Sequence, residues 1–454
     1  MRDPRPGRLM TCAAALWLCC GAALAAEEKT PRKEITVCGE KLRLLTGEEV
    51  KARGFPWVDV ADEDNAAADY IKGANVLHQT RAPETPDEQR EHAIAHGWDD
   101  GMKELAAALE ARKAALDHYR QGASKTLCQL PFGKARMLAG MLLPSLGKAR
   151  QAARLLCVQA RRFEAKGQFR RAVDNYLAVI RIGQHYGTGR TLIDQLVGIA
   201  CITIGTDAAF TGICRHHYPR KELERLMAEL AARRPHMPEF AHAMRSERAF
   251  GLGTIDDLMR LGPEAIGAIT AVHGEEWPAS PSPLQARLVR ILLPDRTVKK
   301  DMAAFYNRSI AAARKPYYTK DARRDLMPGG KPWNILAHML LPALSRARTA
   351  TEKCKAKAAL LGLAVAVKIY QQDVGVYPDS LRWLLQDKIL KKLPDDPFSG
   401  KPYKYKLKDG DFVLYSVCDN LKDDGGKIGR GDGPSGFLDY GFTSKLPPKK
   451  AYRP

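Results

Sequence analysis

Hydrophobic and polar positions alternate with the period of a helix between residues 334 and 370, near the end of the chain. The apolar residues that fall three or four positions apart on one face are Leu360, Leu363, Ala364, Val367 and Tyr370, and the lysines of the other side are Lys353, Lys355, Lys357 and Lys368. This stripe predicts a long amphipathic helix that buries one face. Gly375 should end the helix, because glycine adopts the left-handed backbone conformation that caps helices, and Pro378 cannot continue one.

A short helix and a hairpin are predicted to follow. Asp379 is a suitable N-cap for a helix that reaches Leu385, with the leucines at 381, 384 and 385 facing the core. The proline-rich segment 393–402 should form an irregular turn, because proline fits neither a helix interior nor a central strand. Two strand-like runs, 403–407 and 412–417, then flank Asp409-Gly410, which is a strong hairpin signal.

The order of these elements resembles the C-terminal domain of the major (G-type) pseudopilins of type II secretion. In those proteins the phrase Asp-Pro-aromatic-Gly-x-Pro-aromatic-x-Tyr precedes a strand that ends in Leu-Tyr-Ser. The matching residues here are Asp396-Pro397-Phe398-Ser399-Gly400-Lys401-Pro402-Tyr403-Lys404-Tyr405 and Leu414-Tyr415-Ser416. The resemblance implies a small α+β, pilin-like domain over residues 334–445, built from a long helix and an antiparallel hairpin.

An acidic, glycine-rich loop at residues 418–426 is the candidate ligand site. Its metal-ligand candidates are Asp419, Asn420, Asp423 and Asp424. Carboxylates and an amide suit Ca²⁺, which takes about six to eight oxygen ligands, and the equivalent loop of the major pseudopilins binds calcium. This copy departs from the family pattern: Cys418 and Leu421 stand where glycine is usual, and the terminal Asp-Ile pair is represented only by Leu438-Asp439. Two interpretations stay open, a calcium site and an acidic turn that is simply solvated.

The module lacks the apolar membrane helix with which a true pseudopilin begins. A membrane-spanning helix needs about 20 apolar residues. The segment 335–344 is shorter and contains His338 and Pro342, so it cannot span a bilayer. We therefore expect a pilin-like module joined to another protein, with no transmembrane segment in the mature chain.

The first 25 residues have the order of a secretory signal peptide. Arg2, Arg5 and Arg8 precede an apolar run that ends in Ala23-Leu24-Ala25, an Ala-x-Ala cleavage site. A lipoprotein is the alternative, although the residues before Cys19 lack the small residue that is usual before a lipidated cysteine. We expect an exported protein, located in the periplasm, in the cell envelope or outside the cell.

The chain between the signal peptide and the module is predicted to be nearly all helix. Apolar residues recur at helical spacing over 65–77, 101–119, 191–204, 223–232, 239–261 and 297–313. The expected fold class is mainly α, a helical bundle or a short tetratricopeptide-like superhelix followed by the α+β module. The hairpin around Asp409-Gly410 is the only substantial β-structure expected.

Another pair of predicted helices, between the ranges 101–119 and 191–204, resembles the tetratricopeptide hairpin. The residues that carry the resemblance are Leu156, Ala160 and Phe163 on the first helix, and Gly167, Phe169, Ala172, Tyr176 and Val179 on the second. After the signal peptide, the expected regions are an N-terminal helical region (26–134), a tetratricopeptide-like region (135–220), a helical region with proline-rich linkers (221–330), the pseudopilin-like domain (334–445) and a loose tail (446–454).

Charge and cysteine content narrow the classes of partner and site. Removing residues 1–25 leaves 69 basic and 51 acidic residues, a balance that favours anionic envelope polymers or surfaces. The positive charges are spread over many helical faces without interleaved aromatics, so the pattern does not favour nucleic acid. Seven widely spaced cysteines remain, which is not a disulfide framework. His92 and His96 lie four residues apart, and a helical surface pair is favoured over a metal site.

The sequence contains no phosphate-binding glycine loop, nucleophile elbow or HExxH motif. Its order of signal, helices and pilin-like end resembles a family of uncharacterised exported bacterial proteins. The resulting hypothesis is a non-enzymatic envelope protein that binds other envelope proteins through its helical scaffold and its pseudopilin-like module. The alternatives are an envelope hydrolase with an unrecognised site and a binder of anionic polymers.

The first testable prediction concerns export. Protein recovered from cells should begin near residue 26, because the charged, apolar and Ala-x-Ala segments occur in the order that signal peptidase requires. N-terminal sequencing measures this directly. An intact Met1 on soluble cytoplasmic protein would contradict the prediction.

Overall fold

A computed structural model of the chain describes residues 33–81, 87–134, 143–261, 296–319, 335–429 and 438–446. The predicted signal peptide lies outside the described residues. So do the loose tail beyond residue 446 and most of the proline-rich linkers of the region 221–330.

The described chain is mainly helical with a small antiparallel sheet near the C-terminus, which confirms the mainly α class. The helices of the body are α2 (Gly47–Ala52), α3 (Ala66–Gln79), α4 (Asp87–His96), α5 (Lys103–Ala111), α6 (Lys113–Ser124), α7 (Ser145–Ala165), α8 (Phe169–Gly187), α9 (Leu192–Arg215), α10 (Arg220–Arg233), η2 (Arg234–His236), α11 (Phe240–Leu261) and α14 (Arg296–Ala313). The C-terminal module comprises α16 (Ile335–Val374), α17 (Trp383–Gln386), β3 (Lys404–Lys408), β4 (Asp411–Ser416) and β5 (Tyr440–Thr443).

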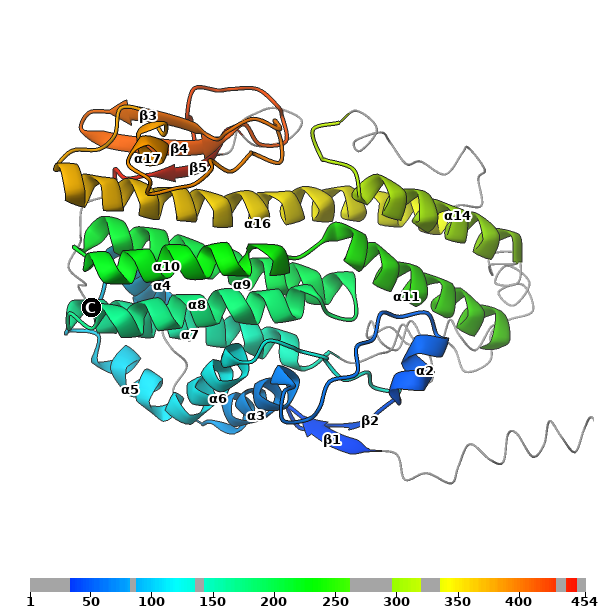
Figure 1. The fold of residues 1–454 in the computed structure, drawn as a ribbon. Helices are drawn as coiled ribbons and strands as arrows, with labels where there is room; N and C mark the ends of the chain where they lie inside the picture. The colour runs from blue at the N-terminus through cyan, green and yellow to red at the C-terminus, as the bar shows by residue number, and fades with distance from the viewer. Residues whose placement is uncertain are drawn as a thin grey trace, which may run out of the picture.

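Helix α16 runs across the molecule between the C-terminal sheet on one side and α9 and α10 on the other (Figure 1). It ends as predicted, because Gly375 has a φ of 87° and its amide donates to the Gln371 carbonyl at 2.9 Å. More of the helix surface is buried, however, than the single predicted apolar stripe. From Leu360 to Val367 every residue except Gly362 is at most 2% exposed, since both faces of the helix are covered.

The lysines that were expected to face solvent instead join α16 to its neighbours. Lys357 Nζ lies 2.6 Å from a carboxylate oxygen of Asp207 on α9 and 4.8 Å from the ring centre of Tyr440 on β5. Lys355 Nζ lies 3.0 Å from Glu239. A lysine can bury its aliphatic stem and place its ammonium at a polar partner, which explains why the sequence pattern alone misplaced these residues.

Helices α8 and α9 form an antiparallel pair that approaches closely at two glycines. A Cβ atom on Gly183 would lie 2.6 Å from the Gly198 carbonyl oxygen, and one on Gly198 would lie 2.4 Å from the Gly183 carbonyl oxygen. Helix α9 is long and apolar enough to cross a membrane by length and composition, and 67% of its most apolar window is buried inside the protein. Its apolar character is thus accounted for by packing in the centre of the bundle.

The C-terminal sheet has the order β3-β4-β5 and is antiparallel throughout. Asp409 and Gly410, with φ values of 54° and 80°, form the predicted turn between β3 and β4. Strand β5 was not predicted, because its four residues follow a glycine-rich segment. Phe442 on β5 stacks on Phe210 of α9 with ring centres 4.0 Å apart, so the module shares a core with the helical body.

Three further differences from the sequence predictions have local causes. Strands β1 (Glu34–Val37) and β2 (Glu40–Arg43) form a hairpin that was not predicted. Its turn places Cys38 at a φ of 51°, and a cysteine does not mark a tight turn in a sequence as glycine or asparagine does. The expected helix over 101–119 is divided at Arg112 into α5 and α6. Helix α17 begins at Trp383, four residues after the expected cap, and leaves Leu385 37% exposed.

A buried ionic cluster ties the helices of the body together. The Arg161 guanidinium and the Glu164 carboxylate, both on α7 and both fully buried, lie 2.8 Å apart. Tyr176 of α8 donates to Glu164 at 2.6 Å, and Tyr218, before α10, donates to the same oxygen. Arg161 also donates to the Ala208 carbonyl of α9 at 2.7 Å. Each charge thus has partners on elements that are distant in sequence.

Replacing Glu164 by glutamine should cost about 3–5 kcal/mol of unfolding free energy, because the buried Arg161 cation would lose its anion. Glu224→Gln is the matched control. Glu224 pairs with Arg220 at 2.8 Å with both side chains about half exposed, and such pairs contribute less than about 1 kcal/mol. Urea unfolding of the two variants measures the difference. Equal small losses would show that the cluster contributes little.

Candidate functional site

The predicted ligand residues lie together in the loop that follows β4. Cys418 and Leu421 have φ values of 56° and 59°. The loop therefore adopts, at these two positions, the left-handed conformation that glycine would adopt more easily, at a cost of roughly 1–2 kcal/mol each. This part of the loop therefore holds a backbone shape that its own residue types do not favour.

The side chains of the loop find partners on α16 and β3. Asp419 Oδ1 lies 3.4 Å from Lys353 Nζ of α16. Asp423 Oδ2 lies 3.2 Å from Lys404 Nζ of β3, and its Oδ1 accepts the Tyr415 hydroxyl at 2.9 Å. Desolvation raises the pKa of Asp423, but hydrogen bonds from the Gly425 amide, the Tyr415 hydroxyl and Lys404 lower it by more, so the net shift is downward. Asp423 is therefore ionised near neutral pH, and both Asp419 and Asp423 already have a lysine as partner.

Asn420 and Asp424 form a second pair within the same loop. The Asn420 amide donates to Asp424 Oδ2 at 2.7 Å, and Asn420 Oδ1 accepts the Lys422 amide at 2.9 Å. The amide side chain thus fixes the local turn with both of its polar atoms. In this arrangement Asn420 Oδ1 faces the backbone of its own turn.

Asp439, which the sequence offered only as a loose match, is the acceptor that closes the loop. It is 1% exposed and accepts the amides of Asp424 at 3.2 Å and of Gly426 at 2.7 Å. Burial raises its pKa, and the negative charges of Asp423 and Asp424 raise it further against the two hydrogen bonds. A bound cation would relieve that repulsion.

The loop thus holds candidate oxygens without gathering them around one point. Among the described residues no group of three or more His, Cys, Asp or Glu side chains is placed to hold a metal ion. In the present arrangement Asp419 and Asp423 face different lysines. Calcium binding by Asp419, Asn420, Asp423 and Asp424 stays a prediction, and it would require these side chains to turn away from their present partners.

Asp396, in the proline-rich turn, organises the rest of the module. It is 1% exposed and accepts from the Ser416 hydroxyl at 2.8 Å, the Phe398 amide at 3.0 Å and the Val417 amide at 3.2 Å. Burial raises its pKa, and these hydrogen bonds act in the opposite direction. The Asp396 carboxylate thereby joins the proline-rich turn to the end of β4, which is a physical reason for an aspartate at this position.

The other candidate groups form local contacts. The rings of His92 and His96 lie 4.7 Å apart on α4, as expected for residues one turn apart on a helix. The seven cysteines are all free thiols. Burial raises the pKa of Cys157, Cys201 and Cys354 to about 12, which leaves these thiols protonated and unreactive near neutral pH.

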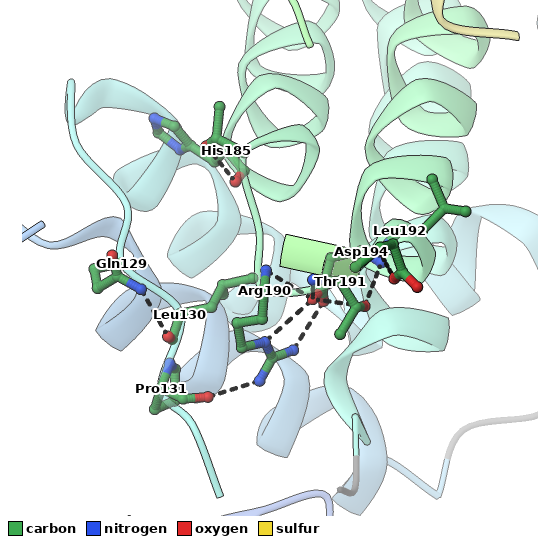
Figure 2. A network of polar contacts seen from close by, with 10 residues as sticks. Gln129, Leu130, Pro131, His185, Arg190, Thr191, Leu192 and Asp194 are labelled. Atoms are coloured by element: carbon green, nitrogen blue, oxygen red, sulfur yellow. Dashed lines mark hydrogen bonds and ion pairs between the residues drawn. The ribbon is translucent and has the colours of Figure 1, made fainter. Parts of the chain in front are cut away.

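A buried ion pair at the start of α9 was not found by sequence reasoning (Figure 2). Arg190 Nη2 lies 2.8 Å from Asp194 Oδ1, and Arg190 Nη1 donates to the Pro131 carbonyl at 2.7 Å. Thr191 and Asp194 form a capping box. The Thr-x-x-Asp spacing was a signal for the cap, whereas nothing in the sequence linked Arg190 to Pro131.

Figure 2 also shows His185, on α8 near this cap. Its Nδ1 lies 2.7 Å from the Tyr70 hydroxyl, and burial, followed by the charge of Arg181, lowers the pKa of His185 to about 3. The imidazole is therefore neutral at physiological pH. It joins α3 to α8 as a hydrogen-bonded core residue.

Comparisons with known proteins add no assignment, since no family model, no curated protein and no solved structure matches the chain. The candidate site is therefore defined by its own geometry.

The calcium prediction is tested by thermal melting of the full chain with calcium and with chelator. Calcium should raise the melting temperature, and a hundredfold excess over Kd would add about 2.7 kcal/mol of stability. The gain should be larger in Lys404→Gln, because the ammonium that competes for Asp423 is removed.

An Asp423→Ala/Asp424→Ala variant is the control and should not respond to calcium. Identical melting in calcium and chelator, for both the original chain and Lys404→Gln, would show that the loop is an acidic turn held by lysines.

Proposed function

We propose that this chain is an exported, non-enzymatic protein of the cell envelope that acts by binding other envelope proteins. The helical body serves as a scaffold, and the pseudopilin-like module presents the contact surface. The observation that supports this proposal most directly is the exposure of large apolar side chains on the module.

Five such side chains belong to the segment from the end of α16 to β3. They are Val374 (49% exposed), Val376 (62%), Trp383 (44%), Leu385 (37%) and Leu407 (41%). Single exposed apolar residues are ordinary, whereas a contiguous apolar patch marks an interaction site, and we propose that these five side chains contribute to one. Tryptophan is also enriched among the residues that dominate binding energy at interfaces.

The way in which the module is attached supports a scaffold role. Sheet and helical body share α16 and the Phe210–Phe442 stack, so the module is held at a fixed place on the bundle. A rigidly held surface loses less conformational entropy on binding than a flexible one. A partner bound to the module would therefore be placed in a defined orientation relative to the helices.

Binding of anionic envelope polymers is the second candidate, and the formal net charge of +20 favours it. A hydrolase with an unrecognised site is the third. Incubation of the purified protein with a panel of envelope polymers separates these candidates, because a hydrolase releases products and a binder only retains the polymer. Salt-sensitive retention without turnover would favour the polymer-binding role over protein binding.

The leading proposal predicts a specific cross-linking pattern in cells. A photo-reactive amino acid at Val376 should give a discrete cross-linked protein, because this side chain is the most exposed of the five. The same residue at Glu110, an exposed position on α5, is the control. Trp383→Ser should reduce the Val376 product without changing the melting temperature. The absence of a Val376 product, or an equal product from Glu110, would contradict the proposal.

A further inference from the structure

A pocket of about 500 Å³ lies between α10, α16 and the loop that follows α17. Its apolar wall includes Met227, Leu230, Met237, Leu390 and Pro394. This volume falls within the range of about 300–1,000 Å³ that is usual for small-molecule sites. Methionines adapt to unbranched aliphatic chains, because their side chains are flexible and polarizable.

The charges around this pocket are not balanced. Four basic side chains line it (Arg233, Arg234, Lys355 and Lys392), against two acidic ones (Glu239 and Asp395). Lys355 pairs with Glu239 at 3.0 Å and Lys392 with Asp395 at 3.7 Å. No side-chain hydrogen bond or ion pair of Arg234 is found in the described part of the chain.

Arg233 adds a second cation at the wall, and one of its donors is unused within the described ranges. Its guanidinium pairs with Glu229, but its Nε is buried without a hydrogen-bond partner among the described residues. Burial and the charges of Arg181 and Arg225 lower the pKa of Arg233 to about 10. An anion in the pocket would therefore meet the exposed guanidinium of Arg234 and the partly buried cation of Arg233.

Gly362 of α16 is a separate indication that the pocket is kept open. Glycine is the least favourable helix residue apart from proline, and α8 and α9 use it where a Cβ atom would meet the backbone of the other helix. A Cβ atom on Gly362 would meet nothing within 4 Å. Close packing therefore does not require this glycine, and its effect is to leave space at the pocket wall that it lines.

We propose that this pocket binds a small amphipathic anion, a monocarboxylate with an unbranched aliphatic body. The carboxylate would bind the Arg234 guanidinium, which can offer two parallel N–H donors. The aliphatic chain would lie against Met227, Leu230 and Met237. One unpaired guanidinium suits a single negative charge, and the apolar wall excludes a ligand that is polar along its whole length. This site does not depend on the interaction surface proposed above.

The test is calorimetric titration of the full chain with decanoate below its micellar concentration. We expect saturable binding of one decanoate per chain, with 1-decanol and acetate each binding at least about tenfold more weakly, because each lacks one of the two recognised parts. An acetylated dipeptide acid that binds more tightly than decanoate would overturn the choice of a free amphiphile.

Three variants locate the site. Gly362→Leu should abolish binding while keeping or raising the melting temperature, because leucine fills the space and favours the helix. Arg234→Gln should weaken decanoate at least about tenfold and leave 1-decanol unchanged. Arg382→Gln, an exposed arginine of the module away from the pocket, should bind as the original chain does. No saturable binding of decanoate, or binding unchanged in Gly362→Leu, would overturn the proposal.

Discussion

The rest of the structure depends on the enclosure of α16 on both faces. A helix with one apolar stripe can lie on the surface of a bundle, but seven residues of α16 between Leu360 and Val367 are buried all round. Full burial of each large aliphatic side chain stabilises the fold by about 1.5–3 kcal/mol, and here that stabilisation requires the sheet as well as the helices. Because neither layer alone can cover α16, the module and the body fold as partners around one core.

This enclosure dictates where the lysines of α16 must go. A lysine near a covered face can keep its charge only if its ammonium reaches a carboxylate, a carbonyl or an aromatic ring. Lys353 and Lys357, each with a side chain only 12% exposed, reach Asp419 and Asp207 respectively. The acidic loop therefore gains a cation from α16, and the position of the loop is coupled to the packing of the long helix.

The sequence predicted the elements whose signals are local. Gly375 marked the end of α16, Asp409-Gly410 marked the hairpin, and Asn65 caps α3 where apolar spacing began. Strand β5 and the β1–β2 hairpin were missed because short strands owe their stability to neighbours rather than to their own residues. Leu385 was wrongly placed in the core because the short helix starts later than its apparent cap.

The candidate site was predictable in composition and not in geometry. Four of its residues stood out as an acidic loop, but their partners come from positions far away in the sequence, such as Lys353 and Asp439. The same holds for the ionic cluster of α7, in which Glu164 meets Tyr218 across 54 positions. Side chains of this kind give no periodic signal, since a single charged residue reads the same whether it is solvated or buried.

The fold also changes what the net charge means. Asp396 and Asp439 are each 1% exposed, and the hydrogen bonds that they accept come from backbone amides and hydroxyls. Each removes a negative charge from the surface without withdrawing a positive one. The buried pairs Arg161–Glu164 and Arg190–Asp194 remove one charge of each sign and leave the difference unaltered. Buried cations act in the opposite direction, because Arg112 and Arg348 are 4% and 8% exposed and donate to backbone carbonyls. The net charge of the chain therefore sets the long-range attraction for an anionic partner, whereas the charged side chains that stay exposed set the contacts which that partner would meet.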